Sequence, residues 1–176
     1  MDMFGVESQA IDDSTSKPVR TFTPDTVLPE LVSFTVDMDA AKLFLSFSEP
    51  ILASSIVIPQ KLVLTDGVTL ETATLTDGTA TTTDSLIVVV SMTHTDMGVI
   101  KVQTSLFADK AKSILTVSAN LVTDMAGNRL NPSTKPAVAY TPDATEPILV
   151  NFAVNMHTGT IQLNFDEPVR ANTLVV

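Results

Sequence analysis

Residues 23–57 of the chain are TPDTVLPELVSFTVDMDAAKLFLSFSEPILASSIV, and residues 141–175 are TPDATEPILVNFAVNMHTGTIQLNFDEPVRANTLV. The two stretches align without a gap at a spacing of 118 residues, and they share the same residue at 15 of 35 positions. Numbered in the first copy, the recurring residues are Thr23, Pro24, Asp25, Pro29, Leu31, Val32, Phe34, Val36, Met38, Leu45, Phe47, Glu49, Pro50, Ala53 and Val57. Solenoid repeats have periods of about 20–50 residues, so this much longer period predicts a repeated domain.

The repeat divides the chain into three parts. Residues 23–140 are expected to form one complete repeat, and residues 141–176 the N-terminal strands of the following repeat. Residues 1–22 are expected to be the C-terminal end of a preceding repeat, because Lys17-Pro18 precedes Lys135-Pro136 by the same spacing. Each connector carries two prolines within seven residues, which predicts a stiff, extended link between neighbouring domains.

Apolar residues alternate along the first half of the repeated stretch. Val32, Phe34, Val36 and Met38 have one parity, and the second copy keeps it. Successive side chains of a strand point to opposite faces, so this pattern predicts a strand with these four residues on one face. Residues 43–47 alternate in the same way. The two segments are therefore expected to be the first two strands, paired or facing each other across the core.

The rest of the repeat continues the β pattern. The apolar run at residues 86–90 is the best candidate for a central strand buried on both sides. A short helix is expected within residues 95–107, with Thr95 or Asp96 as its N-cap. Further strands are expected at residues 56–65, 68–76, 114–118, 120–122 and 135–141. About seven strands separated by turn signals are typical of an all-β antiparallel sandwich.

Composition excludes several classes of function. The net charge is −10 with only ten Lys and Arg residues, and these are scattered, which argues against nucleic acid as a partner. The chain has no cysteine, so thiol catalysis, cysteine-bound zinc and disulfides are excluded. No run of 18 apolar residues is present, so no transmembrane segment is expected. There is no phosphate-binding glycine loop and no catalytic triad order, and we predict that the chain is not an enzyme.

Three sequence elements carry a resemblance to a known family. They are LVSFTVDMDAAKLFLSFSEPI at residues 31–51, VTDMAGN at residues 122–128 and the TPD connector. Together they resemble bacterial Ig-like domains of the surface-layer type. The resemblance implies an Ig-like β-sandwich, tandem arrays in large secreted or cell-surface proteins, and roles as spacers, lattice or filament units, or adhesin stalks.

Acidic and amide side chains at the ends of the expected strands are candidate cation ligands. Asp124 and Asn128 belong to a D-x-x-G-N loop, and their oxygens could join the connector residue Asp143 around Ca²⁺, which prefers six to eight oxygen ligands. Glu49 and Asp25 recur in the second copy and are further candidate calcium ligands. The alternative for the loop is a plain turn in which Asp124 accepts backbone N–H bonds. The alternative for Glu49 is a strand end at which its side chain bonds the backbone.

These observations favour a structural repeat of an extracellular array such as a surface layer, a flagellar hair or another filament. Its partners would be neighbouring repeats and other copies, which exposed strand edges can pair with. The alternative is an adhesin module that binds glycans or proteins through its loops, although aromatic residues are only 5% of the chain. Residues 142–176 hold two full strands, and a lone hairpin is marginal in water. This part is therefore expected to need following residues or another chain to fold.

Overall fold

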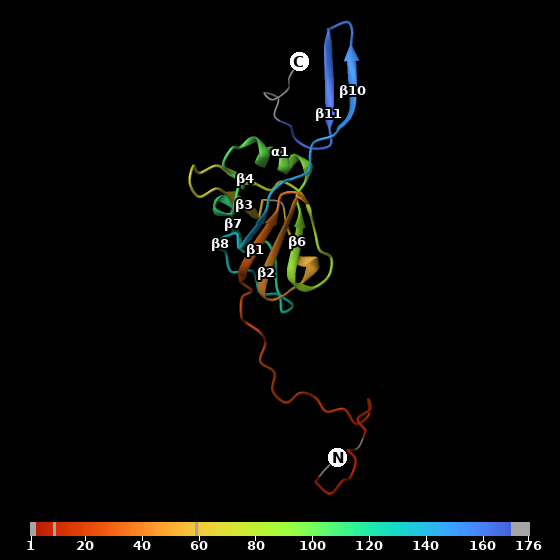
Figure 1. Cartoon of the computed structure of the whole chain (residues 1–176). Helices are drawn as coiled ribbons and strands as arrows, with labels where there is room; N and C mark the ends of the chain where they lie inside the picture. Colours follow the sequence, from red (N-terminus) through yellow and green to blue (C-terminus); the bar gives the residue numbers. More distant parts are fainter. Residues whose placement is uncertain (1–2, 9, 59, 170–176) are drawn as a thin grey trace.

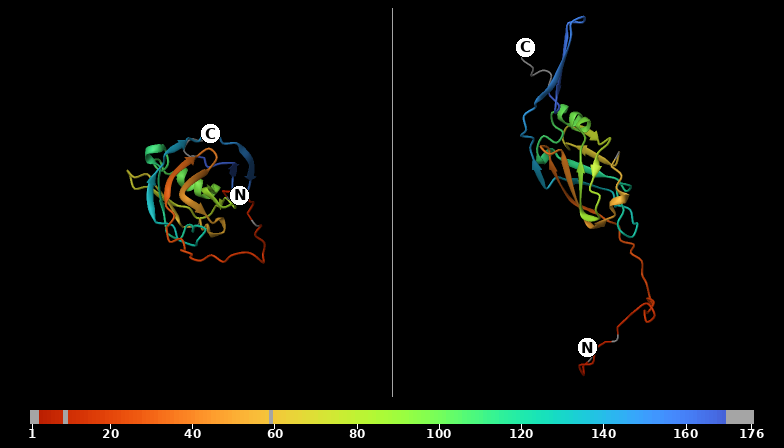
Figure 2. Two further views of the ribbon diagram at one scale, coloured as in Figure 1. Left: turned by 90° about the horizontal axis from the view of Figure 1, so that it is seen from below. Right: turned by 90° about the vertical axis from the view of Figure 1, so that its right-hand side faces the viewer.

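The computed structural model describes residues 3–8, 10–58 and 60–169. An extended N-terminal stretch leads into a β-sandwich, and a separate two-stranded hairpin projects from the opposite end of the sandwich (Figures 1 and 2). Within the described residues, no helix is long and apolar enough to cross a membrane. The second copy of the repeat is described up to Val169, and its last residues lie outside the described part.

The sandwich is built from two sheets. The first has the strand order β5-β6-β2-β1-β9, and the second has the order β4-β3-β7-β8. All neighbouring strands are antiparallel except β1 and β9, which are parallel. The strands are β1 (Leu31–Asp37), β2 (Lys42–Ile51), β3 (Leu62–Thr65), β4 (Thr72–Thr74), β5 (Thr79–Ala80), β6 (Ser85–Ser91), β7 (Ile114–Val117), β8 (Ser133–Pro136) and β9 (Ala139–Thr141). The predicted all-β antiparallel sandwich is confirmed, and the described residues contain more strands than the seven expected.

In the β1–β2 hairpin, the burial predicted from the alternation of apolar residues is correct at three positions and wrong at one. Phe34, Val36 and Met38 are buried, as predicted, but Val32 is 57% exposed and Leu31 takes the core position instead. The pairing register shifts between Leu31 and Ser33, which marks a β-bulge. A bulge adds one residue to one strand and so reverses which face later residues occupy. The prediction that Val32 shares the face of Phe34 is therefore wrong.

Strand β6 differs from the central strand predicted for residues 86–90. Val88 and Val90 are buried, but Leu86 and Ile87 are about half exposed. The strand lies next to the edge of its sheet, beside the two-residue strand β5. From Val88 onward its side chains alternate between core and solvent because only one face of this sheet packs on the other sheet, and at Leu86 and Ile87 the pairing register with β2 shifts. The prediction of burial on both sides is wrong for this reason.

The predicted helix is α1 (His94–Val102), but its cap differs from the expectation. Thr93 is the N-cap, and its hydroxyl accepts a hydrogen bond from the backbone N–H of Asp96. Asp96 is buried instead of capping, and it accepts hydrogen bonds from the backbone N–H and the hydroxyl of Thr76. The helix is thereby tied to the loop that follows β4. Two short 3-10 helices, η1 (Ala53–Ser55) and η2 (Lys110–Lys112), complete the helical elements of the described chain.

The C-terminal part of the repeat crosses from one sheet to the other. Residues 135–141 were predicted to be one strand, but they contribute to β8 in one sheet and β9 in the other. Between them, the N–H of Ala137 donates to Ser113 and the N–H of Val138 donates to Phe34. Residues 120–122 are turn and loop instead of the expected strand. A crossing of this kind depends on partners far away in sequence, so local periodicity cannot reveal it.

The core lies between the two sheets and under α1. Phe34 from β1 stacks on Phe107, with ring centroids 6.4 Å apart. The hydroxyl of Tyr140 donates hydrogen bonds to the carbonyls of Phe107 and Ala108, which holds this loop over the core. The other large, fully buried side chains are Leu31, Leu43, Leu45, Ile51, Leu62, Leu64, Leu75, Ile100, Leu115 and Leu121.

The projecting hairpin repeats the first hairpin of the sandwich in sequence and in register. It consists of β10 (Leu149–Asn155) and β11 (Thr160–Phe165). Leu149 pairs with Phe165 as Leu31 pairs with Phe47, and both hairpins have the bulge at the same place. The hairpins differ in burial, since Phe152 is 64% exposed where Phe34 is fully buried.

Candidate cation site and repeat junction

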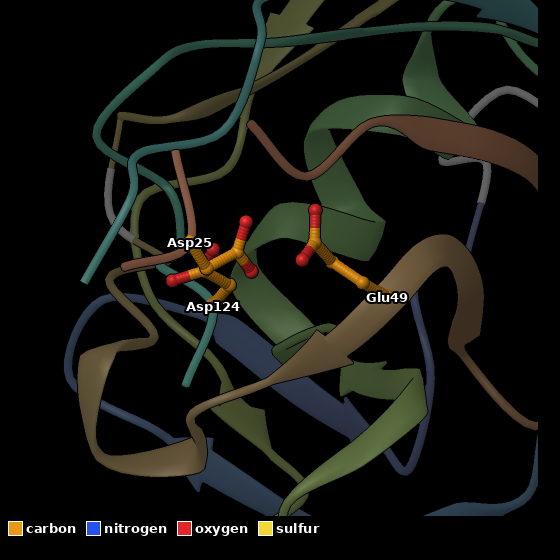
Figure 3. A group of neighbouring side chains, drawn as sticks. All are labelled: Asp25, Glu49 and Asp124. Atoms are coloured by element: carbon orange, nitrogen blue, oxygen red, sulfur yellow. The ribbon is translucent and has the colours of Figure 1, made fainter. Parts of the chain in front are cut away.

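Three carboxylates gather where the N-terminal connector meets the sandwich. Asp25 belongs to the connector, Glu49 lies near the end of β2, and Asp124 belongs to the loop that begins beside that strand end. One oxygen from each carboxylate lies within 4.8 Å of the other two. In Figure 3 the carboxylate of Glu49 faces those of Asp25 and Asp124. An isolated antiparallel bridge between Ile51 and Asp124 brings the loop to this position.

Asp124 is held as a charged group by its own loop. Its Oδ1 accepts hydrogen bonds from the backbone N–H groups of Ala126 and Asn128, each at 2.8 Å, and its Oδ2 accepts one from the Asn128 amide at 2.8 Å. Burial raises the pKa of Asp124, but the hydrogen bonds from Asn128, Ala126 and Gly127 together outweigh it and hold the pKa below its ordinary value. Gly127 has a positive φ of 91°, so the loop also has the turn geometry of the alternative interpretation.

Asn128 and Glu49 complete the cluster in different ways. The Asn128 amide also donates to the carbonyl of Asp25, at 3.3 Å, which fastens the connector to the loop. The Oε1 atom of Glu49 is buried and has no hydrogen-bond partner among the described residues. Burial, followed by the charges of Asp124 and Asp25, raises the pKa of Glu49. The cluster is thus a concentration of negative charge that a cation would stabilise.

The residues present fit a cation and fit calcium in part. Ca²⁺–oxygen distances are about 2.3–2.6 Å, so oxygens on opposite sides of one ion lie about 5 Å apart, and the three carboxylate oxygens here all lie within 4.8 Å of one another. However, both oxygens of Asp124 already accept hydrogen bonds, and Asn128 turns its amide N–H₂ toward the cluster. A calcium ion would therefore need water for much of its coordination, whereas a cation with few ligands would not.

The remaining predicted ligand, Asp143, lies outside this cluster and belongs to the junction with the projecting hairpin. Its carboxylate pairs with the Nζ of Lys101 at 2.6 Å, and Glu167 pairs with the same Nζ at 2.5 Å. Burial lowers the pKa of Lys101, but the hydrogen bonds and charges of the two carboxylates outweigh it and raise the pKa. These three groups line a cleft of about 740 Å³. One lysine of α1 thus holds the connector and the end of β11 together.

A second contact fixes the connector to the sandwich. Asp39, in the turn between β1 and β2, accepts hydrogen bonds from the backbone N–H groups of Ala144 and Thr145 and from the Thr145 hydroxyl, at 2.8–3.0 Å. These bonds lower the pKa of Asp39. No pattern in the sequence indicated Asp39 or Lys101 as junction residues. The recurrence of the TPD connector within the chain indicates the junction, but no local pattern identifies which distant side chains reach it.

We expect Glu49→Gln to stabilise the folded chain at neutral pH. The folded-state pKa of Glu49 lies above its ordinary value of 4.5, so the folded chain binds the proton more tightly than the unfolded chain does. The stability contributed by this group is full below the ordinary pKa and is lost as pH rises through the folded pKa. Glutamine removes that loss, so its advantage should grow from pH 4 to pH 7.

Thermal unfolding midpoints recorded between pH 4 and pH 8 measure this effect. Glu146→Gln, at an exposed glutamate of the second connector, removes the same charge and should shift the midpoint far less. A Glu49→Gln chain less stable than the parent at pH 7 would contradict the expectation, because it would mean that the carboxylate is compensated by a favourable partner.

No protein-family model and no curated protein matches the chain. Three solved chains are similar to it in structure. The S-layer protein rSbsC(31-844) is similar at 16% identity with a TM-score of 0.44, covering 78% of this chain and 18% of that one. The N-terminal part of the bacterial S-layer protein SbsC is similar at 15% identity with a TM-score of 0.43, covering 78% of this chain and 31% of that one. Domains 1–6 of the surface layer protein SbsC are similar at 15% identity with a TM-score of 0.45, covering 82% of this chain and 20% of that one.

This chain spans less than one-third of the length of each of these solved chains. Every TM-score is below 0.5 and the identities are 15–16%, so these similarities assign no function to the chain.

Proposed function

We propose that the chain is a section of a tandem array of Ig-like β-sandwiches that serves as a rigid spacer and assembly unit of an extracellular or cell-surface structure. This structure would be a surface layer, a flagellar hair or a similar filament. The division of the chain at residues 22 and 140 is part of this proposal. Neighbouring repeats and other copies of the protein are its partners.

One observation carries the proposal. The first hairpin of the sandwich recurs as β10–β11 with the same pairing register and the same bulge. The connector between the sandwich and this second hairpin is hydrogen-bonded to the sandwich. Asp39 and Lys101 hold that connector through hydrogen bonds and ion pairs at 2.5–3.0 Å. Several such bonds across a short, proline-flanked link restrict the angle between neighbouring domains. A chain of domains with fixed angles transmits force and spacing, which a lattice or filament requires.

The carboxylate cluster of Asp25, Glu49 and Asp124 is proposed to take part in the junction with the preceding repeat. It lies on the connector side of the sandwich and concentrates three acidic groups, one of them with a buried, unpartnered oxygen. A cation there would tie the connector, β2 and the 124–128 loop together. Calcium and an ammonium group are two cations that carboxylate oxygens in this arrangement can bind.

A chain with two complete repeats tests the spacer role. Residues 1–140 followed by residues 23–176 place a second copy behind the first, and both copies are then preceded by an aromatic residue and a Thr-Pro-Asp connector. Small-angle X-ray scattering should show a maximum dimension longer by one domain and a rigid, elongated shape. A collapsed particle, or a broad distribution of shapes, would refute the proposal.

The setting of the array requires a separate measurement. Antibodies against the full chain should label the surface of intact source cells in immunogold electron microscopy. A glycan array probed with the full chain addresses the adhesin alternative, and specific binding there would favour the adhesin role over the spacer role.

A further inference from the structure

Two acidic residues of the candidate cation site, Asp25 and Glu49, recur at the second junction, where the equivalent residues bind a lysine side chain. Asp143 is the counterpart of Asp25 in the repeat, and Glu167 is the counterpart of Glu49. At the second junction both carboxylates bind the ammonium group of Lys101, at 2.6 and 2.5 Å. Lys101 belongs to α1 of the sandwich that precedes this pair in the chain. The pair therefore accepts a lysine from the preceding repeat.

The two glutamates share a second feature. The Oε1 atoms of Glu49 and Glu167 are both buried and both lack a hydrogen-bond partner among the described residues. The other oxygen of Glu167, Oε2, is the one that receives the Lys101 ammonium group. Equivalent residues in equivalent hairpins thus present the same partly buried carboxylate. The difference is that Glu49 faces the charges of Asp25 and Asp124, with no described lysine between them.

We propose that the Asp25–Glu49–Asp124 cluster is the socket for a lysine ammonium on the helix of the preceding repeat, the counterpart of Lys101. This inference rests on the proposed function, because it requires repeats that follow one another in one array. Each junction is then closed by a lysine of one domain inserted between the connector Asp and the strand-end Glu of the next domain.

The chemistry of the cluster favours an ammonium group over a metal ion. An ammonium group has three N–H donors, and three carboxylates supply one acceptor each. Calcium prefers six to eight oxygen ligands, and both oxygens of Asp124 are already engaged by its own loop. A lysine at this cluster would also match the second junction, where the equivalent pair of residues, Asp143 and Glu167, binds Lys101.

The two-repeat chain described above also tests this inference. Lys101 of the first copy then precedes Asp25 and Glu49 of the second copy, as it precedes Asp143 and Glu167 in the natural chain. Because the protein has no cysteine, Leu86→Cys in each copy gives two unique sites for spin labels, and Leu86 is exposed in β6. The width of the distance distribution between the labels reports how firmly the junction is held.

Three variants are compared with the parent: Lys101→Met in the first copy, Glu49→Gln in the second copy, and the two substitutions combined. Each single substitution is expected to broaden the distribution about twofold, and the combination no further, because both remove one interaction. Lys110→Met, at an exposed lysine of η2 in the first copy, is the charge-matched control and should leave the width unchanged. Chelation with EGTA should also leave it unchanged.

The outcomes separate this inference from the proposed function. A parent chain with a broad distribution refutes the rigid spacer itself. A narrow distribution that Lys101→Met and Glu49→Gln do not change leaves the spacer intact and overturns the lysine socket. A narrow distribution that EGTA broadens and Lys101→Met does not also overturns it, and assigns the cluster to calcium.

Discussion

Phe34→Ala is expected to reduce the free energy of unfolding by about 3–5 kcal/mol, the usual cost of truncating a buried phenylalanine. Phe34 is fully buried in the first sheet and stacks on Phe107, so its loss leaves a cavity between the sheets and removes a ring contact. Urea unfolding of the full chain, followed by far-ultraviolet circular dichroism, measures the change. A loss of this size is a large part of the total stability of a domain, and partial unfolding at 37 °C is expected.

The repeat supplies a matched control for this substitution. Phe152 occupies the same place in β10, with the same pairing register, and is 64% exposed. Phe152→Ala should change the unfolding free energy of the sandwich by about 0.5 kcal/mol or less. Similar losses at both positions would contradict the structure, because they would mean that Phe152 is also part of a packed core.

The β10–β11 hairpin is expected to have almost no stability of its own. All residues of β10, and all of β11 except Phe165, are exposed on both faces, among them Val150, Val154 and Ile161. Backbone amides in β10 and β11 should exchange with solvent at least about 100-fold faster than those in β1 and β2, since local opening there breaks few buried contacts. Hydrogen exchange followed by mass spectrometry resolves the two hairpins because their sequences differ.

The same reasoning applies to the excised segment. A peptide of residues 142–176 should show no stable sheet by circular dichroism at low concentration, because an isolated two-stranded hairpin is marginal in water. A chain of residues 23–140 is the folded reference for this measurement. A stable sheet in the peptide would contradict the expectation and would mean that the second copy does not depend on further strands.

The sequence analysis located the candidate site only in part. It named Asp25, Glu49, Asp124 and Asn128 from their recurrence and from the D-x-x-G-N loop, and the structure brings these four together. It grouped Asp143 with them, but the structure pairs that residue with Lys101. Which connector faces the loop depends on where the loop lies relative to both ends of the sandwich. The linear sequence does not contain that information.

The sequence by itself determined the repeat period, the β class and the location of the first two strands; that these two strands pair with each other came from the structure. The period, the class and the location follow from residue identity and two-residue periodicity, which act over short distances along the chain. The tertiary structure decided the split of residues 135–141 between two sheets, the burial of Asp96 against Thr76 and the role of Lys101. Each of these depends on hydrogen bonds, ion pairs or packing between residues that fold into contact only when the two sheets and the helix assemble. Their energies are set by distance in space and not by position in the sequence.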